Sequence, residues 1–211
     1  VIVAVHGAQS SKTDVPFRLL AEALPGWQVL SFDLPEHGDR KDEPTLCKPP
    51  VCVREFSAVL DYAESRWTDL GLFAVSMGAY FSLLACPGRS ISHTWLLSPV
   101  TDMERLTQDM MNLFQISEAR LETEKTIPTP LGQTLYWDDY CYIRAHPIDR
   151  WPFPTDILRG AEDTLAAEET VAAFAKRFSC RLRTLPSTEH WFHTPEELEA
   201  LSCWLRETAA G

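Results

Sequence analysis

The sequence predicts an α/β fold: a three-layer sandwich in which helices cover a mostly parallel six-stranded sheet. Two observations lead to this class. Short apolar runs of strand length alternate with longer segments whose apolar residues recur at helical spacing. The first run, Val1–Val5, is apolar at every position, which is typical of a parallel strand buried on both faces. We therefore expect a single domain spanning residues 1–211.

The first half of the chain alternates strand and helix patterns. After the first strand, a helix begins at Thr13 or Asp14, carries Pro16 in its first turn and ends before Pro25-Gly26. The remaining elements expected here are strands at 27–32, 72–75 and 93–97, an amphipathic helix at 53–67, and a helix that follows Ser76 and runs through Cys86.

The second half interrupts this alternation at residues 101–150, a segment too long for a plain connection. It holds one helical pattern, then a proline-bearing bend, then a group of aromatic residues. Strands at 155–159 and 180–185 and a helix at 168–178 follow. A last helix opens with the capping box Thr194-Pro195-Glu196-Glu197.

Ser76 lies where an apolar strand pattern changes into a helix through small residues. This turn resembles the nucleophile elbow of the α/β-hydrolase family, G-x-S-x-G, although Ala74 stands at the first glycine and only Gly78 keeps the second. The resemblance implies that Ser76 is a nucleophile and that the backbone N–H of Met77 contributes to an oxyanion hole. The alternative is an ordinary serine at a helix N-terminus.

Other segments carry the same resemblance. His6-Gly7 ends the first strand, and in the family such a pair implies that the backbone N–H of Ala8 is the second oxyanion donor. The loop from Asp33 to Arg40 resembles the family's D-x-P-G-H-G-x-S loop, with departures at Glu36 and Arg40. In that loop His37 is expected to be structural rather than a base.

Ser76, Asp163 and His190 each follow a predicted strand, in the Ser, acid, His order of α/β-hydrolases. Parallel strands bring these loops to one edge of the sheet. His190 would take the proton of the serine, and Asp163 would orient the imidazole. Glu162 and Asp102 remain alternatives for the acid.

Two other histidines are assigned no catalytic part. His193 lies near His190, but the sequence lacks the H-E-x-x-H pattern or carboxylate cluster of a metal site, and we expect no metal. His146 precedes a proline and is expected in a loop.

In α/β-hydrolases an insertion at the position of residues 101–150 forms a small helical cap over the active site. By that resemblance Met111, Phe114 and Trp137 would line an apolar groove for the substrate. The alternative is a folded excursion that only completes the core.

The implied function is cleavage of carboxylic esters by a Ser-His-Asp acyl-enzyme mechanism. A thioesterase, an amidase or peptidase of the same fold, and a non-catalytic binding protein are the alternatives. The expected partner is a small-molecule acyl substrate. The sequence has no glycine-rich phosphate loop, so we expect no cofactor. It does not indicate the oligomeric state.

Composition excludes further classes. The net charge of −11 and the absence of a basic stripe argue against nucleic acid as a partner. No apolar run approaches the ~18 residues of a membrane span, and no segment has the layout of a signal peptide. The six cysteines form no C-x-x-C motif, which favours free thiols and a cytoplasmic location. Cys47 and Cys52 flank Pro49-Pro50 and would pair only under oxidising conditions.

Overall fold

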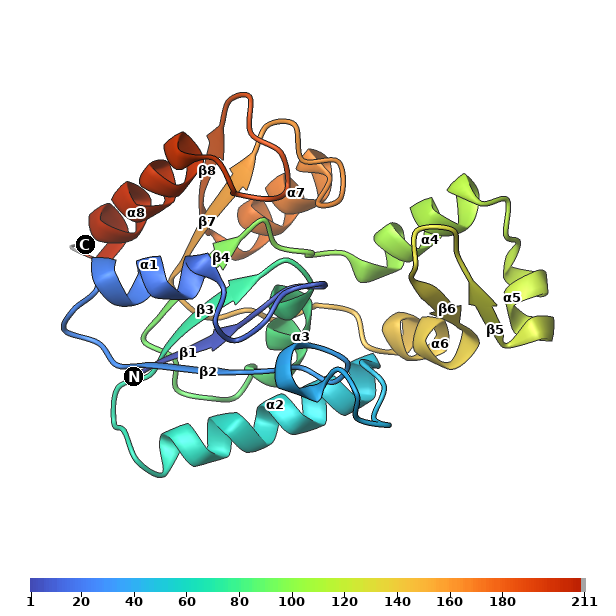
Figure 1. Ribbon diagram of the computed structural model, residues 1–211, viewed down its shortest axis with the longest axis horizontal. Coiled ribbons are helices and arrows are strands. Elements are labelled where there is room, and N and C mark those ends of the chain that lie inside the picture. Colours follow the sequence, from blue (N-terminus) through green and yellow to red (C-terminus); the bar gives the residue numbers. More distant parts are fainter. Residues whose placement is uncertain (210–211) are drawn as a thin grey trace.

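A six-stranded sheet forms the centre of the computed structural model, which describes residues 1–209 (Figure 1). In chain order its strands are β1 (Ile2–Val5), β2 (Val29–Phe32), β3 (Gly71–Val75), β4 (His93–Leu97), β7 (Thr155–Gly160) and β8 (Arg181–Leu185). They lie side by side in the order β2-β1-β3-β4-β7-β8, and each neighbouring pair is parallel. The predicted α/β class is confirmed.

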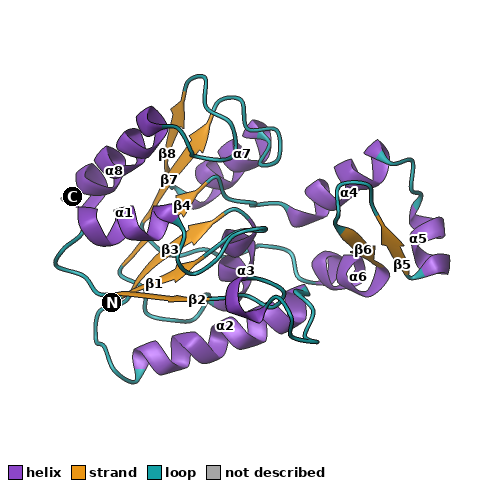
Figure 2. Cartoon of the chain, viewed as in Figure 1, coloured by secondary structure: helices purple, strands orange, loops and turns teal. Residues whose placement is uncertain are grey.

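Helices cover both faces of the sheet (Figure 2). On one face lie α2 (Pro49–Glu64), α3 (Met77–Ala85) and α7 (Glu168–Phe178). On the other lie α1 (Val15–Ala23) and α8 (Pro195–Ala209), which pack against each other. A short 3-10 helix, η1 (Gly38–Arg40), interrupts the loop before α2.

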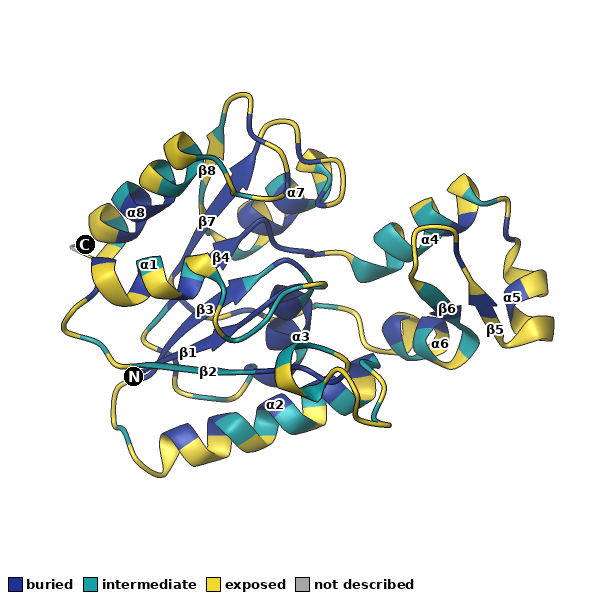
Figure 3. Cartoon of the chain, viewed as in Figure 1, coloured by how far each residue is buried: buried dark blue, intermediate teal, exposed yellow. Residues whose placement is uncertain are grey.

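Strand β1 shows why a central strand is apolar at every position. Val3 and Val5 belong to the core beneath α2 and α3, whereas Ile2 and Ala4 belong to the core beneath α1 and α8. Successive side chains of a strand point to opposite faces, so a strand covered on both faces needs an apolar residue at every position. Figure 3 shows the resulting concentration of buried residues along the central strands.

Helix α2 begins earlier than the sequence pattern indicated, at Pro49 rather than Val53. The prolines occupy the first turn, where the missing N–H removes no helical hydrogen bond and the fixed φ suits the helix. Proline therefore starts this helix rather than delaying it.

The segment 101–150 forms a separate lobe that extends from the carboxyl edge of the sheet (Figure 1). It contains α4 (Met103–Leu113), α5 (Glu118–Glu124), the antiparallel pair β5 (Thr126–Pro128) and β6 (Thr134–Tyr136), and α6 (Trp137–Ala145). The lobe has its own apolar cluster, and α6 packs against α2. Within residues 1–209, no helix is both long enough and apolar enough to span a membrane.

Candidate active site

Ser76 stands on a strained turn between β3 and α3. Its φ of 50° and ψ of −119° are unusual for a residue with a side chain, and such conformations persist only where the surroundings hold them. A Cβ added at Gly78 would lie 2.3 Å from the carbonyl oxygen of His6, and one at Gly7 would lie 2.9 Å from the Cβ of Ser76. The two glycines therefore allow β1 and α3 to approach the serine closely.

A continuous chain of hydrogen bonds links three side chains from distant parts of the sequence. Ser76 Oγ lies 2.8 Å from His190 Nε2. His190 Nδ1 lies 2.8 Å from Asp163 Oδ2 and 2.9 Å from Oδ1. All three residues are buried, so water competes little for these contacts.

The donors in this chain follow from the groups present. An ionised carboxylate only accepts hydrogen bonds, so Nδ1 of His190 donates to Asp163. In the neutral ring Nε2 is then the acceptor for the hydroxyl of Ser76. Asp163 Oδ1 also accepts from the backbone N–H groups of Leu165 and Ala166, at 3.0 and 2.9 Å, which hold the carboxylate in place.

The two backbone N–H groups expected in the oxyanion hole lie at element ends. Met77 is the first residue of α3, so its N–H has no carbonyl four residues earlier in the helix. Ala8 lies in the turn after β1, and Gly7 beside it makes the close approach to Ser76.

The two alternative acids, Asp102 and Glu162, do not form the hydrogen bond to His190. Asp102 is the N-cap of α4, where its carboxylate accepts from the N–H of Arg105 at 2.9 Å. Glu162 is exposed, and His190 meets the neighbouring Asp163 instead.

Three other histidines lie outside this hydrogen-bonded chain. His193 is exposed beside Glu197, and His146 stacks on Tyr142 in the lobe. His6 is fully buried: Nδ1 donates to the carbonyl of Gly7, and Nε2 accepts from the N–H of Leu34. Burial lowers the pKa of His6, so the ring stays neutral and structural.

An apolar cavity of about 270 Å³ opens beside Ser76 and His190. Its walls include Phe17 of α1, Leu97 at the end of β4, and Trp191 in the loop before α8. The sequence predicts a helix around Phe17 but assigns neither Phe17 nor Trp191 a part in the site. The signal that could have revealed this wall is the aromatic pair Trp191-Phe192 directly after the histidine.

Met111, Phe114 and Trp137 lie elsewhere, in the apolar cluster of the lobe. Met111 is 5% exposed and belongs to the buried centre of that cluster, while the other two pack against it. Among residues 1–209, these three are not part of the wall of the cavity beside Ser76. Their role as substrate contacts stays a prediction.

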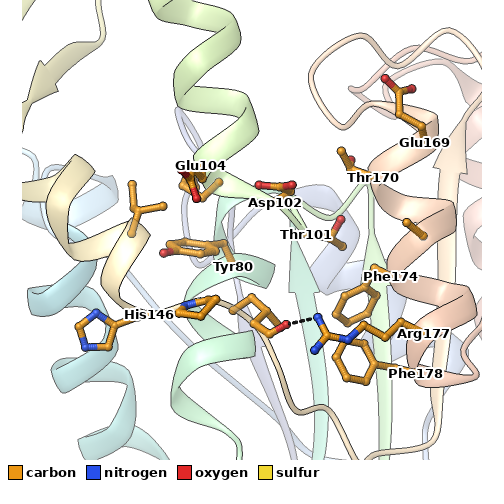
Figure 4. Close-up of a pocket in the computed structure, with 15 residues that line it drawn as sticks. Tyr80, Thr101, Asp102, Glu104, His146, Glu169, Thr170, Phe174, Arg177 and Phe178 are labelled. Carbon is orange, nitrogen blue, oxygen red and sulfur yellow. Dashed lines mark hydrogen bonds between the residues drawn. The ribbon is translucent and has the colours of Figure 1, made fainter. Parts of the chain in front are cut away.

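A larger cavity, about 410 Å³, lies where the lobe joins the body (Figure 4). Both connections of the lobe line it, through Thr101 and Pro147, and α7 forms the opposite wall. Tyr80 of α3 contributes a buried hydroxyl that has no hydrogen-bond partner among the described residues.

A buried carboxylate, which the sequence did not indicate, connects β4, β7 and β8: Asp156 of β7 contacts the partly exposed His93 of β4 and the exposed Arg181 of β8. Asp156 Oδ2 lies 2.8 Å from His93 Nε2 and 2.6 Å from Arg181. Burial favours the neutral carboxyl, but hydrogen bonds from these two partners outweigh it and lower the pKa of Asp156. Residues 1–209 hold no cluster of three metal-ligating side chains.

Comparison with known proteins points to one family. The sequence profile described as alpha/beta hydrolase family matches residues 2–202. No curated protein matches the sequence.

Several solved structures share the fold at low sequence identity. Est1E from Butyrivibrio proteoclasticus, solved with bound ferulic acid, is 21% identical; the match covers 99% of this chain and 87% of that chain, with a TM-score of 0.77. Alpha/beta hydrolase domain-containing protein 10 from mouse is 14% identical, with coverage of 99% and 89% and a TM-score of 0.78. A serine hydrolase without a lid from Xanthomonas campestris is 15% identical, with coverage of 99% and 81% and a TM-score of 0.64.

Proposed function

The chain belongs to the alpha/beta hydrolase family, and we propose that it is a serine hydrolase that cleaves carboxylic esters by an acyl-enzyme mechanism. The hydrogen-bonded chain from Ser76 through His190 to Asp163 is the observation that carries this proposal. A serine hydroxyl is not ionised at neutral pH, so it needs a base in contact with it, and His190 Nε2 occupies that position.

The proposed reaction uses each member of the chain in turn. Ser76 Oγ attacks the ester carbonyl while His190 takes its proton, and Asp163 stabilises the imidazolium that forms. The N–H groups of Ala8 and Met77 would stabilise the oxyanion. Collapse of this intermediate releases the alcohol, which takes the proton from His190. Water activated by the same histidine then hydrolyses the acyl-enzyme.

The cavity beside Ser76 supports an apolar group as part of the substrate. Phe17, Trp191 and Phe192 offer aromatic surface directly next to the serine and histidine. Aromatic walls of this kind suit an acyl or alcohol group with little charge. The bound ferulic acid of the similar Est1E is consistent with this choice, and we include aromatic esters among the candidate substrates.

We also propose that the chain forms a single domain and that residues 101–150 are an insertion that acts as a cap over its active site. Both of its connections line the cavity at the root of the lobe, so a movement of the lobe would change the space beside α3. On this proposal the lobe influences the site through its connections, and the cluster around Met111 keeps the lobe folded.

The test is labelling by an active-site-directed fluorophosphonate, followed by identification of the labelled peptide. We expect label on Ser76, its loss in Ser76→Ala, and full labelling in Ser65→Ala, where an exposed serine is removed. A panel of p-nitrophenyl esters from acetate to palmitate, with thioester and amide counterparts, then assigns the substrate class. Label on another residue, or unchanged hydrolysis by Ser76→Ala, would overturn the proposal.

A further inference from the structure

Two of the free thiols are in contact with each other at the start of α2. Cys47 lies in the loop before the helix and Cys52 in its first turns, and their sulfur atoms are 3.5 Å apart. Cys52 is fully buried, whereas Cys47 is only partly buried and can meet small molecules from solvent. The pair therefore combines a partly exposed cysteine with a fully buried one.

The surroundings favour the thiolate form of Cys47. His37 donates from Nδ1 to the carbonyl of Pro35, at 2.7 Å, which leaves its other nitrogen for the sulfur of Cys47. Hydrogen bonds from the Cys52 thiol and then from His37 lower the pKa of Cys47 to about 6, while burial opposes the shift. The neighbouring thiolate, together with burial, raises the pKa of Cys52.

The carboxylates around the pair oppose a negative charge on sulfur, whereas Arg40 lowers the pKa of Cys52 and Glu55 raises it. Glu36, from the preceding loop, opposes the negative charge on Cys47. The carboxyl of Asp139, on α6, also faces this region, and its pKa is raised to about 7 chiefly by burial. Cys47 therefore depends on His37 and Cys52 to remain a thiolate.

We propose that Cys47 is a site of oxidation by hydroperoxides and that Cys52 converts the product into a disulfide within the same chain. The contact between the two sulfurs, with His37 beside Cys47, carries this inference. It goes beyond the proposed hydrolase function and does not depend on it.

The reaction proceeds in two steps. The Cys47 thiolate attacks the hydroperoxide; an S–O bond forms, the O–O bond breaks, and the departing alkoxide takes a proton from the imidazolium of His37. The sulfur of Cys52 then attacks the sulfur of Cys47; an S–S bond forms, the S–O bond breaks, and the Cys52 proton leaves with the hydroxide as water. Two thiols lose two electrons, and the hydroperoxide is reduced to alcohol and water.

The disulfide would change the contact between the body and the lobe. Closing the sulfurs from 3.5 Å to about 2.05 Å requires movement of the loop, because Cys52 is held in a helix. Lys48, next to Cys47, pairs with Asp138 of α6 at 2.6 Å. Oxidation of Cys47 therefore moves the backbone next to Lys48, the residue whose ion pair connects the start of α2 to the lobe.

The test uses the reduced protein, residues 1–211, treated with stoichiometric tert-butyl hydroperoxide, blocked with N-ethylmaleimide and digested with trypsin. Both cysteines fall in the peptide 42–54, because trypsin does not cleave Lys48-Pro49. We expect this peptide to lose two hydrogens and to take no maleimide. Cys52→Ser should stop at a sulfenic acid that dimedone traps on Cys47, and Cys47→Ser should leave Cys52 reduced.

Cys141 is the internal control, since its exposed sulfur has free access to the same reagents. The lowered pKa of Cys47 leaves a larger fraction of it than of an ordinary thiol as thiolate at pH 6, so Cys47 should be oxidised faster than Cys141 at that pH. Oxidation of Cys141 at the same rate as Cys47, or a peptide 42–54 that still takes two maleimides, would overturn the proposal.

Discussion

Replacing Asp163 by asparagine tests whether this carboxylate determines which nitrogen of His190 carries the proton. Oδ1 of Asp163 accepts from two backbone N–H groups, those of Leu165 and Ala166. An asparagine must keep its carbonyl oxygen there, because turning the amide would leave both N–H groups facing an NH₂ group, at a cost of about 1–3 kcal/mol each. The NH₂ group then occupies the Oδ2 position, 2.8 Å from His190 Nδ1 in the native protein.

This arrangement reverses the tautomer of His190. An NH₂ group donates, and the remaining carbonyl oxygen, 2.9 Å from Nδ1, already accepts from two backbone N–H groups. Nδ1 therefore becomes the acceptor and the proton moves to Nε2, which then cannot take the proton of Ser76. In the Ser-His-Asp template the corresponding change lowers kcat by ~10⁴, about 5.5 kcal/mol in activation free energy. The loss should appear in kcat, because the cavity beside Ser76 is unchanged.

The assay is p-nitrophenyl ester hydrolysis, together with the Tm of each variant. Glu162→Gln is the matched control: it removes the adjacent, exposed carboxylate and should retain nearly full activity. Retention of more than a tenth of kcat by a folded Asp163→Asn protein would refute the reasoning. A crippled Asp102→Asn protein would then identify the other carboxylate as the acid.

Three further predictions concern packing, selectivity and pH. Gly78→Ala should lower the free energy of unfolding by about 1–3 kcal/mol in urea titrations, because its Cβ would lie 2.3 Å from the carbonyl oxygen of His6, directly after β1. Gly26→Ala, with open space around it, should have little effect. Phe17→Ala should flatten the preference for larger acyl groups in the ester panel, where each buried methylene contributes about 0.8 kcal/mol, and Trp137→Ala should lower Tm without changing that preference. Asp156→Asn should lower Tm at pH 7 but have a smaller effect at acid pH. The pKa of Asp156 is lower in the folded state than its value near 4 in the unfolded state, so the carboxylate stabilises the fold above about pH 4, and this stabilisation is lost as pH falls through the folded-state pKa.

Each of these predictions has an outcome that contradicts it. Equal urea midpoints for the two glycine variants would mean that β1 and α3 can separate without cost. A changed acyl preference in Trp137→Ala, with none in Phe17→Ala, would show that the lobe cluster contacts substrate. A Tm difference for Asp156→Asn that does not depend on pH would exclude the ion pair as its cause.

The order of apolar runs along the chain was enough to predict the sheet. A parallel strand covered on both faces needs apolar side chains throughout, and Val1–Val5 shows this without knowledge of its neighbours. The expectation that Ser76, Asp163 and His190 would meet also came from the sequence, because each follows a strand and parallel strands end at the same edge. The structure brings these three side chains into hydrogen-bond contact.

Tertiary structure decided which side chains face the site. Helical spacing placed Met111 and Phe114 on one side of a helix but did not say what that side would meet, and it packs against the lobe's own strands and helices. The wall beside Ser76 includes Phe17 and Trp191, which lie near opposite ends of the chain and come together where α1 and α8 pack on the same face of the sheet. Local pattern specifies which face of an element is apolar, but the element that covers that face depends on contacts between residues far apart in sequence.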